Sequence, residues 1–263
     1  PASVNDEEAR ERIAAVEPEA VAICAYGGLI KEPLLSEHEM LNVHPSLLPR
    51  WRGAAPIERA IEAGDTATGV SIMRPTAELD AGPVCLARAE PIRPDDDFGS
   101  LSSRLEALAG GLLVEALDAR PPFADQPEEG VTFADKVTAE DRRLTADRPA
   151  AELERRVRAL SPHVGAFVEL GGGERLQVLR ARVEETESGG WGHEPRAGEP
   201  GGRSEGRGPP PGELAVVEGR VLFGCSGGAL ELLRVKPPGG REMDAAAYVR
   251  GHPPPGAPQS ARP

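Results

Sequence analysis

The stretch LNVHPSLLPRWRGAAP, residues 41–56, decides both the fold and the function that the sequence predicts. A short β-forming run ends in Asn42 and His44, and a stiff basic loop follows at once. Side chains two residues apart in a strand point to the same face, so these two side chains present to one side. Pro45 keeps His44 extended, because the residue before a proline is disfavoured in the helical region. The pattern therefore predicts an amide and an imidazole side by side at the carboxyl end of a strand.

Strands and helices alternate on both sides of this stretch. Helical patterns are expected at 5–16, 55–64 and 98–119, and strand patterns at 20–28, 40–44, 68–76 and 82–92. The apolar run at 20–28 is typical of a buried parallel strand. This alternation predicts an α/β domain with a largely parallel sheet, in which ligands bind at the carboxyl ends of the strands.

The second half of the chain has a different texture. A polar linker is expected at 121–148 and a helix at 149–160, before five closely spaced strand patterns at 165–170, 175–184, 212–218, 220–225 and 228–235. Five short strands predict a small β-barrel. The expected domains are therefore 1–120 and 149–251. A disordered insertion rich in Gly, Pro and charge is expected at 185–212, and a disordered tail at 252–263.

Composition limits the classes of function. The 263 residues carry a net charge of −13, and the excess acid lies entirely in residues 1–135. Overall charge thus gives no support to nucleic-acid binding, which would need a local basic patch. No apolar run is long enough to span a membrane. The three widely spaced cysteines, Cys24, Cys85 and Cys225, form no metal-binding pattern and predict reduced thiols in a cytoplasmic protein.

A third candidate residue is Asp80, in the turn-like sequence AELDAGP. A carboxylate there could pair with His44 and favour its protonated form. Asn42, His44 and Asp80 would then supply an amide donor, a general acid or base and an orienting anion, as acyl transfer requires. No Ser or Cys is placed as a nucleophile, which favours direct transfer between two bound substrates.

Each of these signals alone also fits a simpler interpretation. Asn42 suits a turn, His44 suits a surface position, and the Asp-Ala-Gly sequence at Asp80 is a common turn signal. Residues 49–53 could form a basic surface loop. Composition does not decide between these interpretations.

The longer pattern is more specific. Residues 41–84 resemble the catalytic core of the formyltransferase family that uses 10-formyltetrahydrofolate. The run Asn-x-His-Pro-Ser-Leu-Leu-Pro marks the family, and the continuation Arg-Trp-Arg-Gly-Ala-Ala-Pro-Ile is typical of its tRNA-directed branch. Residues 131–170 and 211–251 resemble the linker and the C-terminal barrel of that branch.

The resemblance implies a Rossmann-like formyltransferase domain followed by a small OB-like β-barrel domain. It also leads us to expect that the catalytic domain is N-terminally truncated, because the family begins with a further βα unit before the part that matches here. The implied reaction moves the formyl group of 10-formyltetrahydrofolate to the α-amino group of methionine on initiator tRNA, for translation initiation. Two alternatives stay open. One is a related folate-dependent enzyme with another amine acceptor, such as a sugar nucleotide or glycinamide compound, and the other is an inactive truncated remnant.

By the same resemblance, Asn42, His44 and Asp80 match the catalytic residues of the family. The segment that contacts tetrahydrofolate is matched by Ser46, Leu47, Leu48 and Pro49, and residues 23–30 resemble the pterin side of the pocket. Arg50 and Arg52 are candidates for tRNA contact. The expected partners are initiator Met-tRNA and the folate substrate, with no metal and no membrane, and we expect a monomer.

Overall fold

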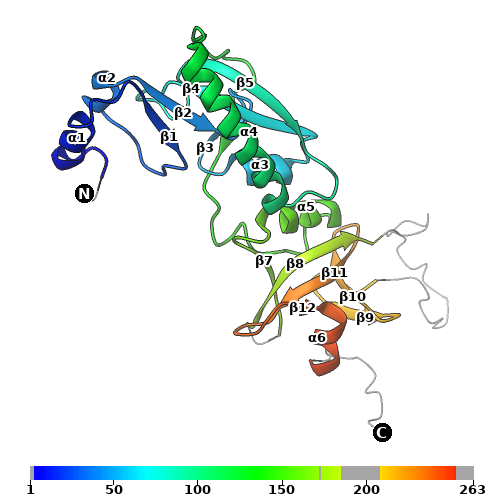
Figure 1. Cartoon of the computed structure of the whole chain (residues 1–263). Coiled ribbons are helices and arrows are strands. Elements are labelled where there is room, and N and C mark those ends of the chain that lie inside the picture. The colour runs from blue at the N-terminus through cyan, green and yellow to red at the C-terminus, as the bar shows by residue number, and fades with distance from the viewer. Residues whose placement is uncertain (1–2, 172, 185–207, 253–263) are drawn as a thin grey trace, which may run out of the picture. The chain divides into compact units, whose positions relative to one another are not determined.

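The computed structural model describes residues 3–171, 173–184 and 208–252, and it divides into two units, residues 1–137 and 138–263. Figure 1 shows the elements of both. The described helices of unit 1 are α1 (Glu7–Ala14), α2 (Leu34–Glu37), α3 (Pro56–Ala63) and α4 (Phe98–Ala119). Its strands are β1 (Val21–Cys24), β2 (Met40–His44), β3 (Arg52–Gly53), β4 (Ala67–Met73), β5 (Val84–Pro91) and β6 (Phe133–Ala134).

The main sheet of unit 1 has the strand order β1-β2-β4-β5 over the described residues. Strand β2 pairs parallel with β1 but antiparallel with β4, and β4 pairs antiparallel with β5. The prediction of a largely parallel sheet is therefore wrong, and the sheet is mixed. The antiparallel pairing of β4 with β5 follows from the loop 74–83, which joins them without a helix, whereas a parallel neighbour needs a longer crossover connection.

Strand β1 differs from its prediction as a buried strand. It lies at one end of the sheet order, and the side chains of Ala22 and Cys24 are exposed. It ends at Cys24, because the next residue, Ala25, has a φ of 51° and leaves the extended region. The remainder of the predicted strand at 20–28 forms a loop, which borders the site described below.

Helix α4 packs against β4 and β5, as Figure 1 shows. It begins with a capping box in which Asp97 and Ser100 bond each other's backbone N–H groups, and it ends at Arg120 in the left-handed region. The predicted helix at 98–119 is thus confirmed. Leu101, Leu105 and Leu112 are fully buried on its inner face, and each such side chain stabilises the fold by about 1.5–3 kcal/mol.

Unit 2 contains helices α5 (Ala150–Leu160) and α6 (Ala245–Gly251). Its described strands are β7 (Ala166–Glu169), β8 (Arg175–Val183), β9 (Leu214–Val217), β10 (Arg220–Cys225), β11 (Gly228–Lys236) and β12 (Met243–Asp244). They form one antiparallel sheet in the order β7-β8-β11-β10-β9, with β12 also paired to β11. The five predicted strands are confirmed, although no ladder joins β7 to β9 among the described residues.

Two predicted disordered segments fall mostly outside the described residues. Residues 185–207 of the insertion and 253–263 of the tail are not among them. The last part of the insertion, 208–212, is described, and it packs against β10. Pro209 is buried there, and the N–H of Gly212 donates to the carbonyl of Gly224 at 2.9 Å.

The stretch predicted as a linker, 121–148, begins inside unit 1. Val84 and Ala124 form two backbone hydrogen bonds, each 2.9 Å long. Further on, β6 pairs parallel with β3, which lies within the stretch 41–56. Residues 121–137 therefore form part of unit 1 and reach the loop that follows β2.

Candidate active site

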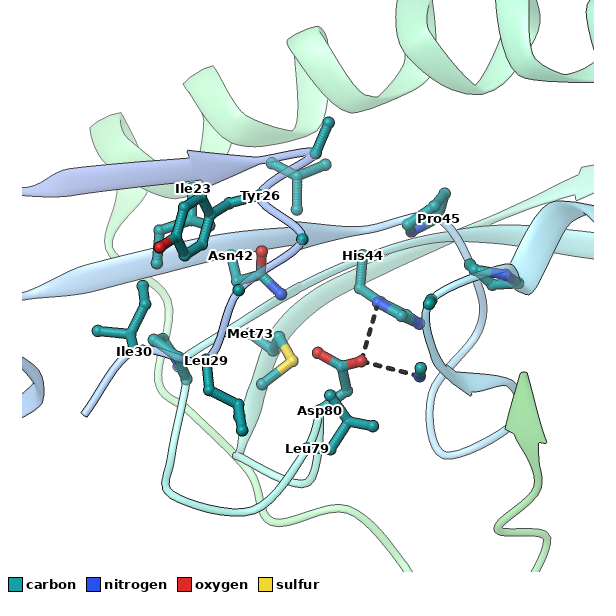
Figure 2. Close-up of a pocket in the computed structure, with 18 of the residues that line it drawn as sticks. Ile23, Tyr26, Leu29, Ile30, Asn42, His44, Pro45, Met73, Leu79 and Asp80 are labelled. Atoms are coloured by element: carbon teal, nitrogen blue, oxygen red, sulfur yellow. Dashed lines mark hydrogen bonds and ion pairs between the residues drawn. The ribbon is translucent and has the colours of Figure 1, made fainter. Parts of the chain in front are cut away.

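Strand β2 places Asn42 and His44 on one face of the sheet, as their spacing predicts. Figure 2 shows both side chains directed into the same cavity. His44 is only 4% exposed, whereas Asn42 is partly exposed. Within the described part of the chain, the side-chain amide of Asn42 has no hydrogen-bond partner in the protein, so its side-chain N–H₂ group is available to a ligand oxygen.

The loop after β2 fixes the ring of His44. Its Nε2 lies 2.8 Å from the backbone carbonyl oxygen of Trp51. A carbonyl oxygen can only accept a hydrogen bond, so we assign the proton of the neutral ring to Nε2. Trp51 is itself held by its indole N–H, which donates to Asp65 at 2.8 Å, and by its backbone N–H, which donates to Thr132 Oγ1 at 2.9 Å. The Nδ1 edge of His44 is thereby turned toward Asp80.

Asp80 lies in the loop 74–83 and has a φ of 48°. Its Oδ2 accepts a hydrogen bond from the backbone N–H of Gly53 at 2.9 Å and lies 3.6 Å from Nδ1 of His44. Both contacts are drawn in Figure 2. The contact with His44 is too long for a strong hydrogen bond, but it would become an ion pair when His44 is protonated. The three predicted catalytic residues are thus brought together.

These side chains border a cavity of about 510 Å³. This volume lies within the range of small-molecule sites. The wall is mostly apolar and comes from the loop 25–30, from β2, from α3 and from the loop after β4. Among the described lining residues there is no Ser or Cys.

The loop 25–30 is held by the N-terminal segment, which the sequence did not connect with the site. The side chain of Asn5 donates to the carbonyl of Leu29 at 2.8 Å and accepts from the N–H of Lys31 at 2.8 Å. The loop places Tyr26 and Leu29 at the cavity, and both side chains are largely exposed. An uncovered aromatic and aliphatic wall suits a flat ligand ring.

The residues Ser46–Pro49 do not line this cavity. Ser46 is buried and stabilises the loop after β2, since its hydroxyl donates to the carbonyl of Arg50 at 2.6 Å. Its own carbonyl accepts from the hydroxyl of Ser71 at 2.8 Å. The folate contact expected of this segment remains a prediction.

Arg50 and Arg52, the candidates for tRNA contact, are both engaged within unit 1. Arg50 makes two hydrogen bonds to the carboxylate of Asp65, at 2.7 and 2.8 Å, and its guanidinium lies over the ring of Trp51. Hydrogen bonding to Asp65 raises the pKa of Arg50 above its ordinary value. Arg52 donates to the side-chain oxygen of Gln126. Their contact with tRNA remains a prediction.

Among the described residues, no group of three or more His, Cys, Asp or Glu side chains is placed to hold a metal ion. No helix in the same part of the chain is long and apolar enough to cross a membrane.

Comparison with known families gives matches to both halves of the chain. Residues 1–117 match the family model described as formyl transferase, and residues 136–253 match the model for the formyl transferase C-terminal domain. The chain is 39% identical over 259 residues to the methionyl-tRNA formyltransferase of Ruegeria pomeroyi, covering 97% of this chain and 78% of that relative. It is 41% identical over 260 residues to the enzyme of that name from a Methylobacterium species, covering 95% and 76%.

Solved structures show the same fold. Methionyl-tRNA formyltransferase from Clostridium thermocellum matches with a TM-score of 0.57 at 20% identity, covering 66% of this chain and 76% of that one. HypX from Aquifex aeolicus, in complex with tetrahydrofolic acid, matches with a TM-score of 0.63 at 20% identity. That match covers 91% of this chain and 40% of the longer HypX chain.

Proposed function

The chain belongs to the formyl transferase family, and on this basis we propose that it transfers a formyl group from 10-formyltetrahydrofolate to the α-amino group of methionyl initiator tRNA. The observation that carries the proposal is the 39% identity with a methionyl-tRNA formyltransferase over 97% of the chain. Asn42, His44 and Asp80, gathered at one cavity, provide the groups that the reaction needs.

The proposed reaction is an attack by an amine on an amide-like carbon. The amine nitrogen bonds to the formyl carbon, an oxyanion forms, and the bond from that carbon to N10 of the folate then breaks. The amine loses a proton and N10 gains one, so the reaction needs no external acid or base. The unpartnered amide of Asn42 and the Nδ1–H of protonated His44 would stabilise the oxyanion.

Asp80 has two roles in this proposal. Its carboxylate oxygen Oδ2 lies 3.6 Å from Nδ1 of His44, close enough to pair with the charged ring when His44 carries both protons. It also lies where it can take the amine proton, directly or through a water, and pass it toward N10. The backbone N–H of Gly53 holds Oδ2, which leaves Oδ1 as the oxygen for this transfer.

Unit 2 is proposed to bind the tRNA through an OB-like arrangement of its strands. Its support is the match of residues 136–253 to the C-terminal domain of the family and the nearly neutral charge of this half beside the acidic first half. A unit without the excess acid repels a polyanion less.

The test is formylation by the purified chain of Met-charged initiator tRNA with 10-formyltetrahydrofolate, read as formylmethionine after release from the tRNA. Parallel reactions offer an amino-sugar nucleotide and glycinamide ribonucleotide as acceptors. Formylmethionine as the main product supports the proposal, and preferential formylation of another amine replaces it with that acceptor. Folate binding without any formyl product would sink the enzymatic proposal and favour the inactive remnant.

A further inference from the structure

Gln126 joins two segments of the site from outside it. Its side-chain N–H₂ group donates to the carbonyl of Asp80 at 2.8 Å and to that of Gly82 at 2.7 Å. Its side-chain oxygen accepts two hydrogen bonds from the guanidinium of Arg52, at 3.0 and 2.8 Å. One half-buried amide therefore uses both of its donors and its acceptor within the protein.

The two segments that Gln126 joins meet at the carboxylate of Asp80. Arg52 immediately precedes Gly53, whose N–H donates to Oδ2 of Asp80 at 2.9 Å. Gln126 thus holds the backbone of Asp80 directly. Through Arg52 it also holds the N–H of Gly53, which orients the carboxylate of Asp80. A residue of this type with a φ of 48° needs such support, because the left-handed region is unfavourable for side chains other than glycine.

The surrounding backbone leaves Gln126 little freedom. On one side, Ala124 is joined to Val84 by two hydrogen bonds; on the other, Thr132 accepts from Arg52 at 2.9 Å. The segment between these anchors therefore carries Gln126 back to the loops at Asp80 and Arg52. Gln126 is therefore placed to fix these two loops against each other.

We propose, on the basis of the function proposed above, that Gln126 is a positioning residue for formyl transfer. Together with Arg52 it forms a clamp, meaning a pair of side chains that holds the backbone at Gly53 against Asp80. Gln126 sets the distance of the Asp80 carboxylate from His44, while remaining outside the cavity lining. A shift of about 1 Å in such a group lowers the rate by up to about 100-fold, because the reacting groups leave their productive geometry.

The test compares Gln126→Ala and Gln126→Glu with the control Asp125→Ala, which changes an exposed neighbouring side chain. The glutamate keeps an acceptor for Arg52 but removes both N–H donors, so it probes the Asp80 side of the clamp alone. We expect both Gln126 variants to lower kcat by about 10- to 100-fold with KM changed by less than about threefold, and the control to match the wild type.

A double-mutant cycle separates positioning from general destabilisation. In an Asp80→Ala background, Gln126→Ala should lower kcat by less than about threefold, because the group that it positions is gone. An equal loss in both backgrounds would overturn the proposal, as would an unchanged kcat in both Gln126 variants of the otherwise wild-type chain.

Hydrogen exchange at the Gly53 amide gives a readout that does not depend on activity. We expect exchange at least about tenfold faster in Gln126→Ala than in wild type or Asp125→Ala, since the bond to Asp80 loosens. Unchanged exchange contradicts the clamp even if catalysis falls. If the wild type forms no formyl product, the proposed function fails, and the exchange rates still decide whether Gln126 holds Gly53 against Asp80.

Discussion

Strand β2 and the loop 74–83 each bring a titratable side chain, His44 and Asp80, to the same cavity, but the two side chains are held in place by different means. His44 is placed by the hydrogen bonds of a sheet and by the alternation of side chains along a strand. Asp80 stands in an unfavourable backbone region and is held by contacts with Gly53 and Gln126, which are remote in sequence. A regular element thus supplies one half of the pair, and tertiary contacts supply the other.

The difference indicates where the site is vulnerable. Sheet hydrogen bonds are numerous and support one another, so the structural effect of a substitution near β2 is shared among several hydrogen-bonded partners. The loop depends on a few side-chain and backbone groups, and loss of one can shift Asp80 while the sheet stays intact. Five experiments with substituted chains distinguish these two kinds of support.

The largest effect is expected when either half of the pair is removed. His44→Ala and Asp80→Ala should each lower the rate of formyl transfer by about 10²–10⁴-fold, as expected for an acid–base group and its partner. The double variant should be little worse than the more damaged single variant, because the two act as a unit. Single-turnover formylation measures this, and wild-type rates in both single variants would refute the assignment.

A smaller effect is expected at Gly53, which supports only the loop side. A side chain there would lie 2.7 Å from the carbonyl oxygen of Ala134, at a φ of 122° that favours glycine. Gly53→Ala should therefore disturb the β3–β6 pairing, lower activity by about 100-fold and reduce the free energy of unfolding by about 1–3 kcal/mol. Activity assays and denaturant titration would show it, with Gly110→Ala, an open position in α4, as the control.

On the sheet side, we expect a loss of stability with little loss of chemistry. Arg104 of α4 bonds Glu90 of β5 and the carboxylate of Asp96, which is only 3% exposed. Arg104→Ala should lower the free energy of unfolding by about 3 kcal/mol, since a buried carboxylate loses its hydrogen bonds from a guanidinium. The value of kcat well below the melting temperature should not change. A loss of kcat without a loss of stability would contradict the idea that this helix–sheet contact supports folding but not the chemistry of the site.

The same cluster predicts a dependence of stability on pH. Hydrogen bonds from Arg104 hold the pKa of Asp96 well below its usual range. A lowered pKa in the folded state means that this stabilisation is present above the ordinary value of about 4 and is lost as the pH falls below it. Melting curves of wild type and Asp96→Asn should therefore converge toward low pH, and a constant difference at all pH values would argue against it.

The smallest effect is expected at Arg88, which joins the same two elements at the surface. Its ion pair with Glu115 measures 2.8 Å, but the two side chains are 50% and 45% exposed. Arg88→Ala should change the free energy of unfolding by no more than about 0.5 kcal/mol, because water and salt screen such pairs. It serves as the matched control for Arg104→Ala, and equal losses in both variants would show that exposure does not matter here.

The sequence predicted the strand side of this comparison better than the loop side. The helix at 98–119 and the strand carrying Asn42 and His44 follow from local patterns of side-chain period and capping, which adjacent residues determine. The direction of β4 was missed, because the side-chain period of a strand is the same in parallel and antiparallel sheets.

The contacts of the loop side leave no such local pattern. The sequence around Asp80 is a common turn signal, and only the resemblance to a family favours a functional role over a simple turn, whereas Gln126 lies in a polar stretch that composition alone marks as a linker. The bonds from Gln126 to Asp80 and from Arg52 to Gln126 cross 46 and 74 positions of the sequence. Only the folded backbone brings these groups within reach of one another.

The pairing of β3 with β6 also bears on how the molecule is made. The hydrogen bond from the N–H of Trp51 to Thr132 links residues 81 positions apart. Contacts at such separation form late, because the entropy of closing a long loop must be overcome before they stabilise the chain. During synthesis on the ribosome, β2 can emerge and pair with β1 long before residue 132 has left the exit tunnel. We therefore expect the nascent chain to acquire a sheet first and a working active site only near the end of unit 1.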